Sequence, residues 1–471
     1  MPKPRRNIPQ YSPKPQEPCL CGSGAAFGDC CAERLPGFEH GERVREAWNS
    51  GDLEAALVAA RAALCQYAIW HKSHTAPIMA LGDRRIEKLL AVDIEALSEF
   101  VGDVCTLHFR LARQRELPAQ LERLRALVAD PRWQRKLTYH QALVLDATSA
   151  HDEARAEFAK LGPIVADTET DVEILQAHLD LFGADMPFAE KLAVCDRILK
   201  LTHSISDHVQ YGGVKAMTYA AIGDVGQAKK ELALAVAYAH MRAKEKPLGS
   251  RAQLLLASAL SFLGLFTREE RRFVEAEEVF KALLADDGHW SAEGFAMLWD
   301  HLGECYRYWG KWAAGDNAYR KALSLHPTGI RSVFLAECVL RLGHKHAAAA
   351  ILDAVKFEEL RPAEQVDYAY ITAEIAVEYS DRDRLKTALA VLEGVVAEEP
   401  YFEQRRLEFI VAVQAELAKG STSWQALKDL LAQPLRQLNR YIMLQPNIAG
   451  FGLNLNAMIE DALGPKDKET D

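Results

Sequence analysis

Residues 297–327, MLWDHLGECYRYWGKWAAGDNAYRKALSLHP, decide the fold of this chain. The pattern predicts two antiparallel helices joined by a short turn. Gly303 and Gly315 are small enough to let the two helices approach closely. Large side chains fill the space around these glycines: Trp299, Leu302 and Tyr319. Pro327 ends the second helix, because proline lacks the amide hydrogen that the helix needs. The stretch is therefore one helical hairpin.

The order of these residues, together with Tyr306 and Ala322, resembles the tetratricopeptide (TPR) repeat, with Gly315 where alanine is usual. Weaker copies of the pattern occupy residues 212–236, 258–284, 334–355 and 370–400. The resemblance implies an all-α fold, a TPR-like helical-hairpin solenoid over residues 201–400. Such an array offers an extended concave surface that usually binds polypeptide.

The rest of the chain is expected to be helical or without structure. Residues 40–200 keep the small-residue rule of the hairpins, so we predict degenerate helical repeats there. Residues 401–463 break the repeat with two prolines and are predicted to form a C-terminal helical cap, although a segment folded back into the groove is an alternative. Residues 464–471 are expected to be a disordered tail, and the proline-rich, basic residues 1–16 a disordered arm.

A second feature is the cysteine-rich stretch EPCLCGSGAAFGDCCAERLP at residues 17–36. Closely paired cysteines in an intracellular chain bind zinc more often than they form disulfides, because zinc takes four soft ligands in a tetrahedron. The glycines between the pairs let the backbone adopt positive φ and turn its amides toward sulfur. A nucleotide loop is not expected here, because no strand–turn–helix pattern surrounds the glycines.

The stretch also resembles the SEC-C motif, the zinc-binding tail of the SecA translocation motor, with Pro18 and Phe27 in matching places. The resemblance implies one structural Zn²⁺ held by four thiolates: Cys19, Cys21, Cys30 and Cys31. We expect a small zinc-binding knob on a flexible arm, and chelation should leave the helical signal of the array nearly unchanged. Family members usually carry two or three lysines around the aromatic, and in SecA the module contacts an export chaperone and is associated with ribosomes and acidic lipid. This chain has Ala25, Ala26, Gly28 and Asp29 in those places, so the resemblance gives weaker support to those particular partners.

Composition narrows the remaining possibilities. The formal charge of -10, from 66 acidic and 56 basic residues, argues against wholesale attraction to nucleic acid or anionic membrane. No apolar run approaches the ~20 residues of a membrane span and no signal peptide is evident, so a cytoplasmic location is expected. Five scattered cysteines are interpreted as buried structural thiols: Cys65, Cys105, Cys195, Cys305 and Cys338.

No catalytic constellation is evident in the sequence. The close histidine pairs, His71 with His74 and His344 with His346, have no carboxylate or cysteine at recognised metal spacing. No Gly-x-Ser-x-Gly elbow or Walker loop occurs. We therefore expect a protein that is not an enzyme.

The leading functional hypothesis is a protein-binding adaptor, in which the TPR groove holds a polypeptide client and the zinc knob contacts a second partner, such as a chaperone, a translocation component or the ribosome. The alternative is an RNA- or ribosome-associated factor that uses the knob and the basic arm, although the knob lacks lysine between its cysteines.

The charge of the groove is a separate prediction. The first helix of the best repeat carries Asp300 and Glu304, and Glu337 follows one repeat later. These carboxylates predict a client with a basic segment. The alternative is that they are solvated, with Arg307 and Arg341 as neighbours.

Overall fold

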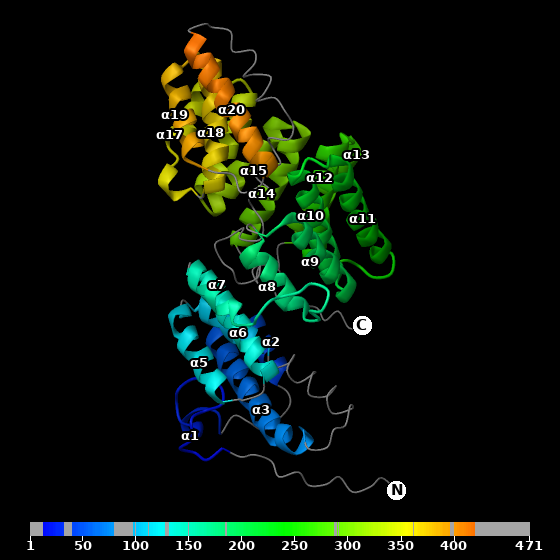
Figure 1. Ribbon diagram of the computed structural model, residues 1–471, viewed down its shortest axis with the longest axis vertical. Coiled ribbons are helices and arrows are strands. Elements are labelled where there is room, and N and C mark those ends of the chain that lie inside the picture. The colour runs from blue at the N-terminus through cyan, green and yellow to red at the C-terminus, as the bar shows by residue number, and fades with distance from the viewer. Residues whose placement is uncertain are drawn as a thin grey trace. The chain divides into compact units, whose positions relative to one another are not determined.

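The computed structural model describes residues 13–32, 40–79, 98–127 except 99 and 112, 131–183 except 149, 186–286, 292–395 except 361, 400–419 and Trp290. Within these residues the regular structure is helical, and the only β-type pairing is an isolated bridge between Pro18 and Ala26. The all-α expectation is confirmed. The described residues form two compact units that divide between Ile164 and Val165 (Figure 1).

Unit 1 contains the cysteine motif and the first helices, drawn from blue to cyan in Figure 1. Its elements are α1 (Phe27–Cys30), α2 (His40–Asn49), α3 (Leu53–Met79), a helix over residues 100–110, the 3-10 turn η2 (Gln114–Glu116), α5 (Leu117–Leu127), α6 (Pro131–Ala147) and α7 (His151–Ala159). Helices α2 and α3 form one hairpin, and α6 and α7 form another. One hydrophobic core joins α3, the 100–110 helix, α5 and α6.

Unit 2 contains the repeats. Its elements are α8 (Val172–Phe182), α9 (Phe188–Leu201), α10 (Ile205–Ala221), α11 (Val225–Ala243), α12 (Ser250–Thr267), α13 (Glu270–Ala285), α14 (Ala292–Trp309), α15 (Trp312–Leu325), α16 (Gly329–Arg341), α17 (Lys345–Asp353), η3 (Phe357–Glu359), α18 (Pro362–Tyr379), α19 (Arg382–Gly394) and α20 (Pro400–Lys419).

The five predicted hairpins are all present in unit 2, as α10–α11, α12–α13, α14–α15, α16–α17 and α18–α19. Each second helix also packs against the first helix of the next pair, and α12 contacts the first helices on both sides, α10 and α14. Every pair thus buries its apolar face against its neighbours, which is the packing of a TPR-like array.

Similar turns join the two helices of each pair. Three of these turns place a glycine in the left-handed region: Gly223 at φ 81°, Gly310 at φ 82° and Gly343 at φ 86°. In the other two pairs a non-glycine residue adopts this conformation, Arg268 at φ 61° and Ser380 at φ 55°. Asp224 and Asp381 then cap the following helices by accepting hydrogen bonds from backbone amides.

Glycine inside the helices sets how closely a pair packs. A Cβ atom added at Gly303 of α14 would lie 3.0 Å from Cζ of Tyr319 in α15. A Cβ at Gly315 would lie 3.0 Å from Sγ of Cys338 in α16. The small residues therefore stand where a large ring or the next helix approaches, as the sequence pattern predicts.

The division of the chain and the hydropathy of its helices bear on the sequence-based expectations. Helices α8 and α9 belong to the stretch predicted as degenerate helical repeats, and they group with the hairpins of unit 2. Helix α12 is long and apolar enough, with a mean hydropathy of 1.2, to pass a length-and-composition test for a membrane span, but 67% of it is buried, as in a core helix. The segments predicted at residues 1–12, 33–36 and 420–471 lie outside the described residues.

Candidate metal centre

The cysteine motif folds as a tight loop closed by a short helix. The backbone amide of Cys19 donates to the carbonyl of Ala25, and that of Phe27 donates to the carbonyl of Glu17. These hydrogen bonds close a loop that contains the first cysteine pair, Cys19 and Cys21. Helix α1 then delivers Cys30 and Cys31 from the other side.

Glycine is required at the turn of this loop. Gly22 and Gly24 adopt φ of 75° and 88°, which side chains with a Cβ atom rarely do. A Cβ at Gly22 would also lie 2.6 Å from Cγ of Leu124 and 2.8 Å from the carbonyl oxygen of Gln120. Helix α5 therefore lies directly against the turn.

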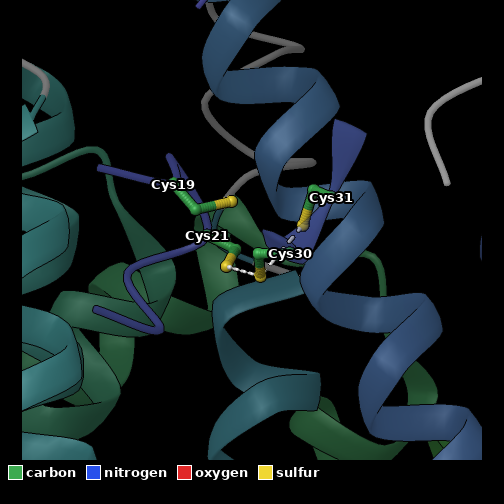
Figure 2. A group of neighbouring side chains, drawn as sticks. All are labelled: Cys19, Cys21, Cys30 and Cys31. Carbon is green, nitrogen blue, oxygen red and sulfur yellow. Dashed lines mark hydrogen bonds between the residues drawn. The ribbon is translucent and has the colours of Figure 1, made fainter. Parts of the chain in front are cut away.

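The four motif thiols meet at one point (Figure 2). The Sγ atoms of Cys19, Cys21, Cys30 and Cys31 all lie within 4.8 Å of one another. The distance from Cys30 Sγ is 3.6 Å to Cys21 Sγ and 3.7 Å to Cys31 Sγ. Zinc–sulfur bonds of about 2.3 Å in a tetrahedron would place neighbouring sulfurs about 3.8 Å apart. The four side chains thus fit a tetrahedral tetrathiolate metal site.

The centre is shielded from water. Cys19, Cys21 and Cys31 are each no more than 1% exposed, whereas Cys30 is partly exposed. The hydroxyl of Ser23 lies 3.3 Å from Cys30 Sγ, within hydrogen-bond distance of the most accessible sulfur. Four thiolates would leave a metal ion no open position for substrate, so the geometry suits a structural ion.

Two side chains of α5 fix the loop that carries the first cysteine pair. Gln120 Nε2 donates to the carbonyl of Cys21 at 2.9 Å, and Arg123 Nε donates to the carbonyl of Gly22 at 2.7 Å. Sequence reasoning missed both, because they lie about one hundred residues from the loop, 99 and 101 positions respectively. Partners of this kind orient the ligands of a metal site.

The motif is also part of the core of unit 1. Leu20 is 1% exposed and Phe27 7%. They belong to one buried cluster with residues of three helices: Leu57, Leu64, Val101, Val104, Leu121 and Leu124. A compact motif that gathers four cysteines is confirmed, but the motif is not separate from the helices, and residues 1–12 of the expected arm lie outside the described residues. The reason is that the apolar side chains of the motif are covered by helices that are distant in sequence.

A fifth thiol stands beside the four. Cys65, in α3, is fully buried and its Sγ lies 3.8 Å from Cys19 Sγ. The neighbouring Cys19 and burial both raise the pKa of Cys65 above its usual range. Sequence reasoning placed Cys65 among the structural thiols, and no local signal links it to the motif.

The other four isolated cysteines are inert by environment. Burial raises the pKa of each of their thiols to about 12: Cys105, Cys195, Cys305 and Cys338. Such thiols stay protonated at neutral pH and behave as small apolar side chains. Their interpretation as structural residues agrees with this.

The carboxylates predicted to form an acidic groove contact basic side chains of the protein itself. Glu337 is 1% exposed and its Oε2 lies 2.7 Å from Nη1 of Arg307, which is itself buried. Glu304 is 5% exposed, and its Oε2 lies 3.3 Å from His301 Nδ1. Asp300 lies 3.7 Å from Arg331. Glu304 and Glu337 are thus neither an exposed acidic face nor solvated carboxylates, although Arg307 and Arg341 do lie beside Glu337, and Asp300 is half-buried.

These ion pairs connect successive first helices of the array. Arg307 of α14 pairs with Glu337 of α16, and Arg341 of α16 pairs with Glu374 of α18 at 2.8 Å. The guanidinium of Arg307 also lies 4.3 Å from the ring centroid of Phe334. The charges thus hold neighbouring repeats in register rather than presenting one sign to a partner.

The histidine pairs contribute no described metal site. His344 and His346 are exposed, and His346 packs against Tyr379 with ring centroids 5.1 Å apart. The side chains of His71 and His74 lie outside the described residues. Among the side chains that the structure describes, the motif cysteines are the only group of three or more ligands gathered closely enough for a metal.

Fold and site together define a class: an all-helical TPR-like repeat protein with a tetracysteine centre near its N-terminus. The SEC-C motif family matches residues 17–33, so the chain carries a SEC-C motif there. A search of curated proteins gave no significant match.

Several solved structures of repeat proteins are similar in outline. A monomeric mutant of IFIT1 with Gppp-AAAA shares 13% identity, with 87% of this chain and 90% of that chain covered and a TM-score of 0.45. The Cut9–Hcn1 hetero-tetramer of the APC/C shares 14% identity, with 90% of this chain and 88% of that chain covered and a TM-score of 0.34. A tetratricopeptide repeat protein from Parabacteroides merdae shares 13% identity, with 67% of this chain and 98% of that chain covered and a TM-score of 0.32. All three TM-scores lie below 0.5, so the assignment of the fold rests on the helix packing described above.

Proposed function

We propose that this chain is a polypeptide-binding scaffold without catalytic activity, working in the cytoplasm. The observation that carries the proposal is the run of five consecutive TPR-like hairpins in unit 2, α10 to α19. Arrays of this kind expose an extended surface along their first helices and use it to bind protein segments. A SEC-C centre in the same chain supplies a second place for contact.

The ion at the motif is proposed to be one structural Zn²⁺. The donor set supports this choice, because four thiolates at tetrahedral spacing suit zinc and leave no position for water. The ion would hold the loop of residues 19–22 against α1. Since the same loop packs on α3 and α5, the metal would stabilise unit 1 as a whole.

The client is proposed to be a polypeptide with no required charge. Glu304 and Glu337 are buried, and Glu337 is neutralised by Arg307, so the earlier preference for a basic client loses its main support. The first helices carry half-buried apolar and aromatic residues: Leu255 in α12, Trp299 in α14 and Tyr368 in α18. Such residues suit contacts to apolar and aromatic side chains of a client.

A second partner is proposed to contact the outer side of the motif. Pro18, Gly24, Ala25 and Asp29 are exposed, whereas three of the four motif cysteines are buried. The exposed guanidinium of Arg123 lies beside Gly24, so this surface carries charges of both signs.

Site-specific photocrosslinking in the native host tests the scaffold. The photoreactive residue p-benzoylphenylalanine is placed at Leu255, Trp299 or Tyr368 of the full chain, and, as controls, at exposed Leu234 of α11 or Leu325 of α15. After irradiation and nuclease treatment, the protein is purified under denaturing conditions. We expect polypeptide adducts from the first-helix positions and few from the controls.

Two results would contradict this proposal. Equal adducts from the first-helix and control positions would show that the first helices are not the binding surface. Adducts that disappear with nuclease would favour the RNA-associated alternative instead. A further variant, Ala25 replaced by the photoreactive residue, reports whether the motif has a partner of its own.

A further inference from the structure

Cys65 meets the metal centre from a different part of the chain. It lies 46 positions after Cys19, within α3, and the two Sγ atoms are 3.8 Å apart. Both side chains are buried in the same core cluster. The contact therefore joins the motif to the longest helix of unit 1, and the SEC-C pattern, which ends at residue 33, does not include it.

A metal-bound site would be negatively charged, so a hydrogen-bond donor beside it would stabilise it. Zinc with four thiolates carries a net charge of -2, and here that charge would lie among alanine and leucine side chains of α3 and α5. A buried anionic group is stabilised by hydrogen bonds to its charged atoms. Ser23 supplies such a contact to Cys30, whereas Gln120 and Arg123 donate to backbone carbonyls.

Cys65 is not one of the four gathered sulfurs, so it meets the centre as a neighbour of Cys19 rather than as a member of the set. The S–H group is a weak donor that can point to a neighbouring thiolate. The Cys19–Cys65 distance of 3.8 Å lies within the 4.0 Å reach of a sulfur hydrogen bond. Cys65 is thus placed to donate to Cys19, a residue that is only 1% exposed to water.

We propose that Cys65 is an outer-shell residue of the metal centre, a positioning residue whose thiol donates a hydrogen bond to the Cys19 thiolate and so slows loss of the ion. The proposal rests on the proposed metal, and the metal content of the unaltered protein tests that assumption separately. Outer-shell partners of metal ligands commonly change affinity by 10- to 100-fold when they are removed.

The test compares two substitutions at Cys65 in the full chain. Cys65→Ala removes the donor, whereas Cys65→Ser keeps one. Cys105→Ala is the matched control, because Cys105 is an equally buried thiol of the same core and has no described contact with the motif sulfurs. Zinc affinity is measured by competition with a chromophoric chelator. We expect a loss of about 10- to 100-fold for Cys65→Ala and near-normal affinity for Cys65→Ser and Cys105→Ala.

A spectroscopic readout separates this role from packing. In the cobalt(II)-substituted protein, a hydrogen bond to a thiolate weakens its electron donation and moves the thiolate-to-cobalt charge-transfer band to shorter wavelength. Cys65→Ala should shift this band to longer wavelength, and Cys65→Ser should restore it. Cys65→Val, which fills more of the space, replaces the alanine variant if the latter does not fold.

Three results would overturn the proposal. Affinity and band position unchanged in Cys65→Ala would show that the contact does nothing for the metal. An equal loss in Cys65→Ala and Cys105→Ala would show a packing effect. A loss of the tetrathiolate spectrum in both Cys65 variants would make Cys65 a direct ligand rather than an outer-shell donor.

Discussion

Gly22 lets helix α5 pack directly against the cysteine motif, because it has no Cβ atom. Its φ of 75° requires glycine, and so does the approach of Leu124 and the Gln120 carbonyl. Gly51, in the turn before α3, has nearly the same φ of 77° but no neighbour within 4 Å of an added Cβ. A substitution at Gly51 would therefore introduce backbone strain alone, whereas the same substitution at Gly22 would add a steric clash with α5.

Gly22→Ala is predicted to destabilise unit 1 more than Gly51→Ala. The left-handed backbone alone costs alanine about 1–2 kcal/mol, which is the whole effect expected at Gly51. At Gly22 overpacking against α5 adds about 1–3 kcal/mol and should weaken metal binding. Denaturant unfolding and zinc titration of both variants measure this. Equal effects would mean that α5 does not press on the turn.

Arg307 and Glu337 form a pair in which both members are buried. Arg307→Ala should destabilise unit 2 by about 3–5 kcal/mol, because the buried Glu337 carboxylate loses its closer partner and keeps the longer contact with Arg341, 3.9 Å away. The double variant Arg307→Met with Glu337→Leu should lose much less, because no isolated charge remains. Equilibrium unfolding of the single and double variants measures the difference.

The control for this pair is the exposed contact between Lys356 and Glu359, whose side chains are 68% and 63% exposed. Lys356→Ala should change stability very little, because solvent screens an exposed ion pair. A cost for Arg307→Ala as small as that of Lys356→Ala would show that the buried pair does not hold the repeats together.

At the scale of elements, the spacing of α14 and α15 depends on Gly303. Its missing Cβ leaves room for the ring of Tyr319, whose Cζ would lie 3.0 Å from an added carbon. Gly213 in α10 is also helical, but an added Cβ there would have no neighbour within 4 Å. The position of a glycine relative to the next helix, rather than its presence in a helix, decides its role.

Gly303→Val should therefore destabilise the α14–α15 hairpin by about 1–3 kcal/mol through overpacking. Gly213→Val should change stability by less than about 0.5 kcal/mol, because valine and glycine differ little in helix propensity. Thermal unfolding followed by circular dichroism compares the two. Tyr319→Leu combined with Gly303→Val should recover part of the loss, and no recovery would argue against the Tyr319 contact.

At the scale of the whole molecule, the metal centre belongs to one of two compact units. Leu20 and Phe27 lie in the core of unit 1, whereas the hairpins of unit 2 have separate cores, such as that of α18 to α20. Loss of the ion should therefore affect the two units differently.

Removal of zinc by a strong chelator is predicted to loosen unit 1 and spare unit 2. Structural zinc contributes on the order of 10 kcal/mol to small motifs, and here the motif shares its core with α3 and α5. Amide hydrogen exchange with mass spectrometry should show faster exchange in residues 53–79 and 117–127, with residues 292–325 unchanged. Circular dichroism should show a partial loss of helix.

Either extreme would contradict this prediction. Unchanged exchange in both units would restore the view of the motif as an independent knob. Faster exchange throughout would show that the two units unfold together.

The sequence by itself determined the hairpins of unit 2 and the cluster of four cysteines. Both are local patterns: a TPR-like hairpin is set by small and large residues within about thirty-four positions, and the cysteines lie within residues 19–31. Gly303, Gly315 and Tyr319 were predicted in the places where the structure puts them. Their roles follow from spacing along one or two helices.

Only the tertiary structure decided what covers these elements. Periodicity tells which side of a helix is apolar, but it does not tell which distant element packs on that side. For this reason the sequence did not reveal that Cys65 meets Cys19, that Gln120 holds Cys21, or that Glu337 is buried against Arg307. These contacts span 46, 99 and 30 positions, and burial of a charge or a thiol is a property of the packed molecule.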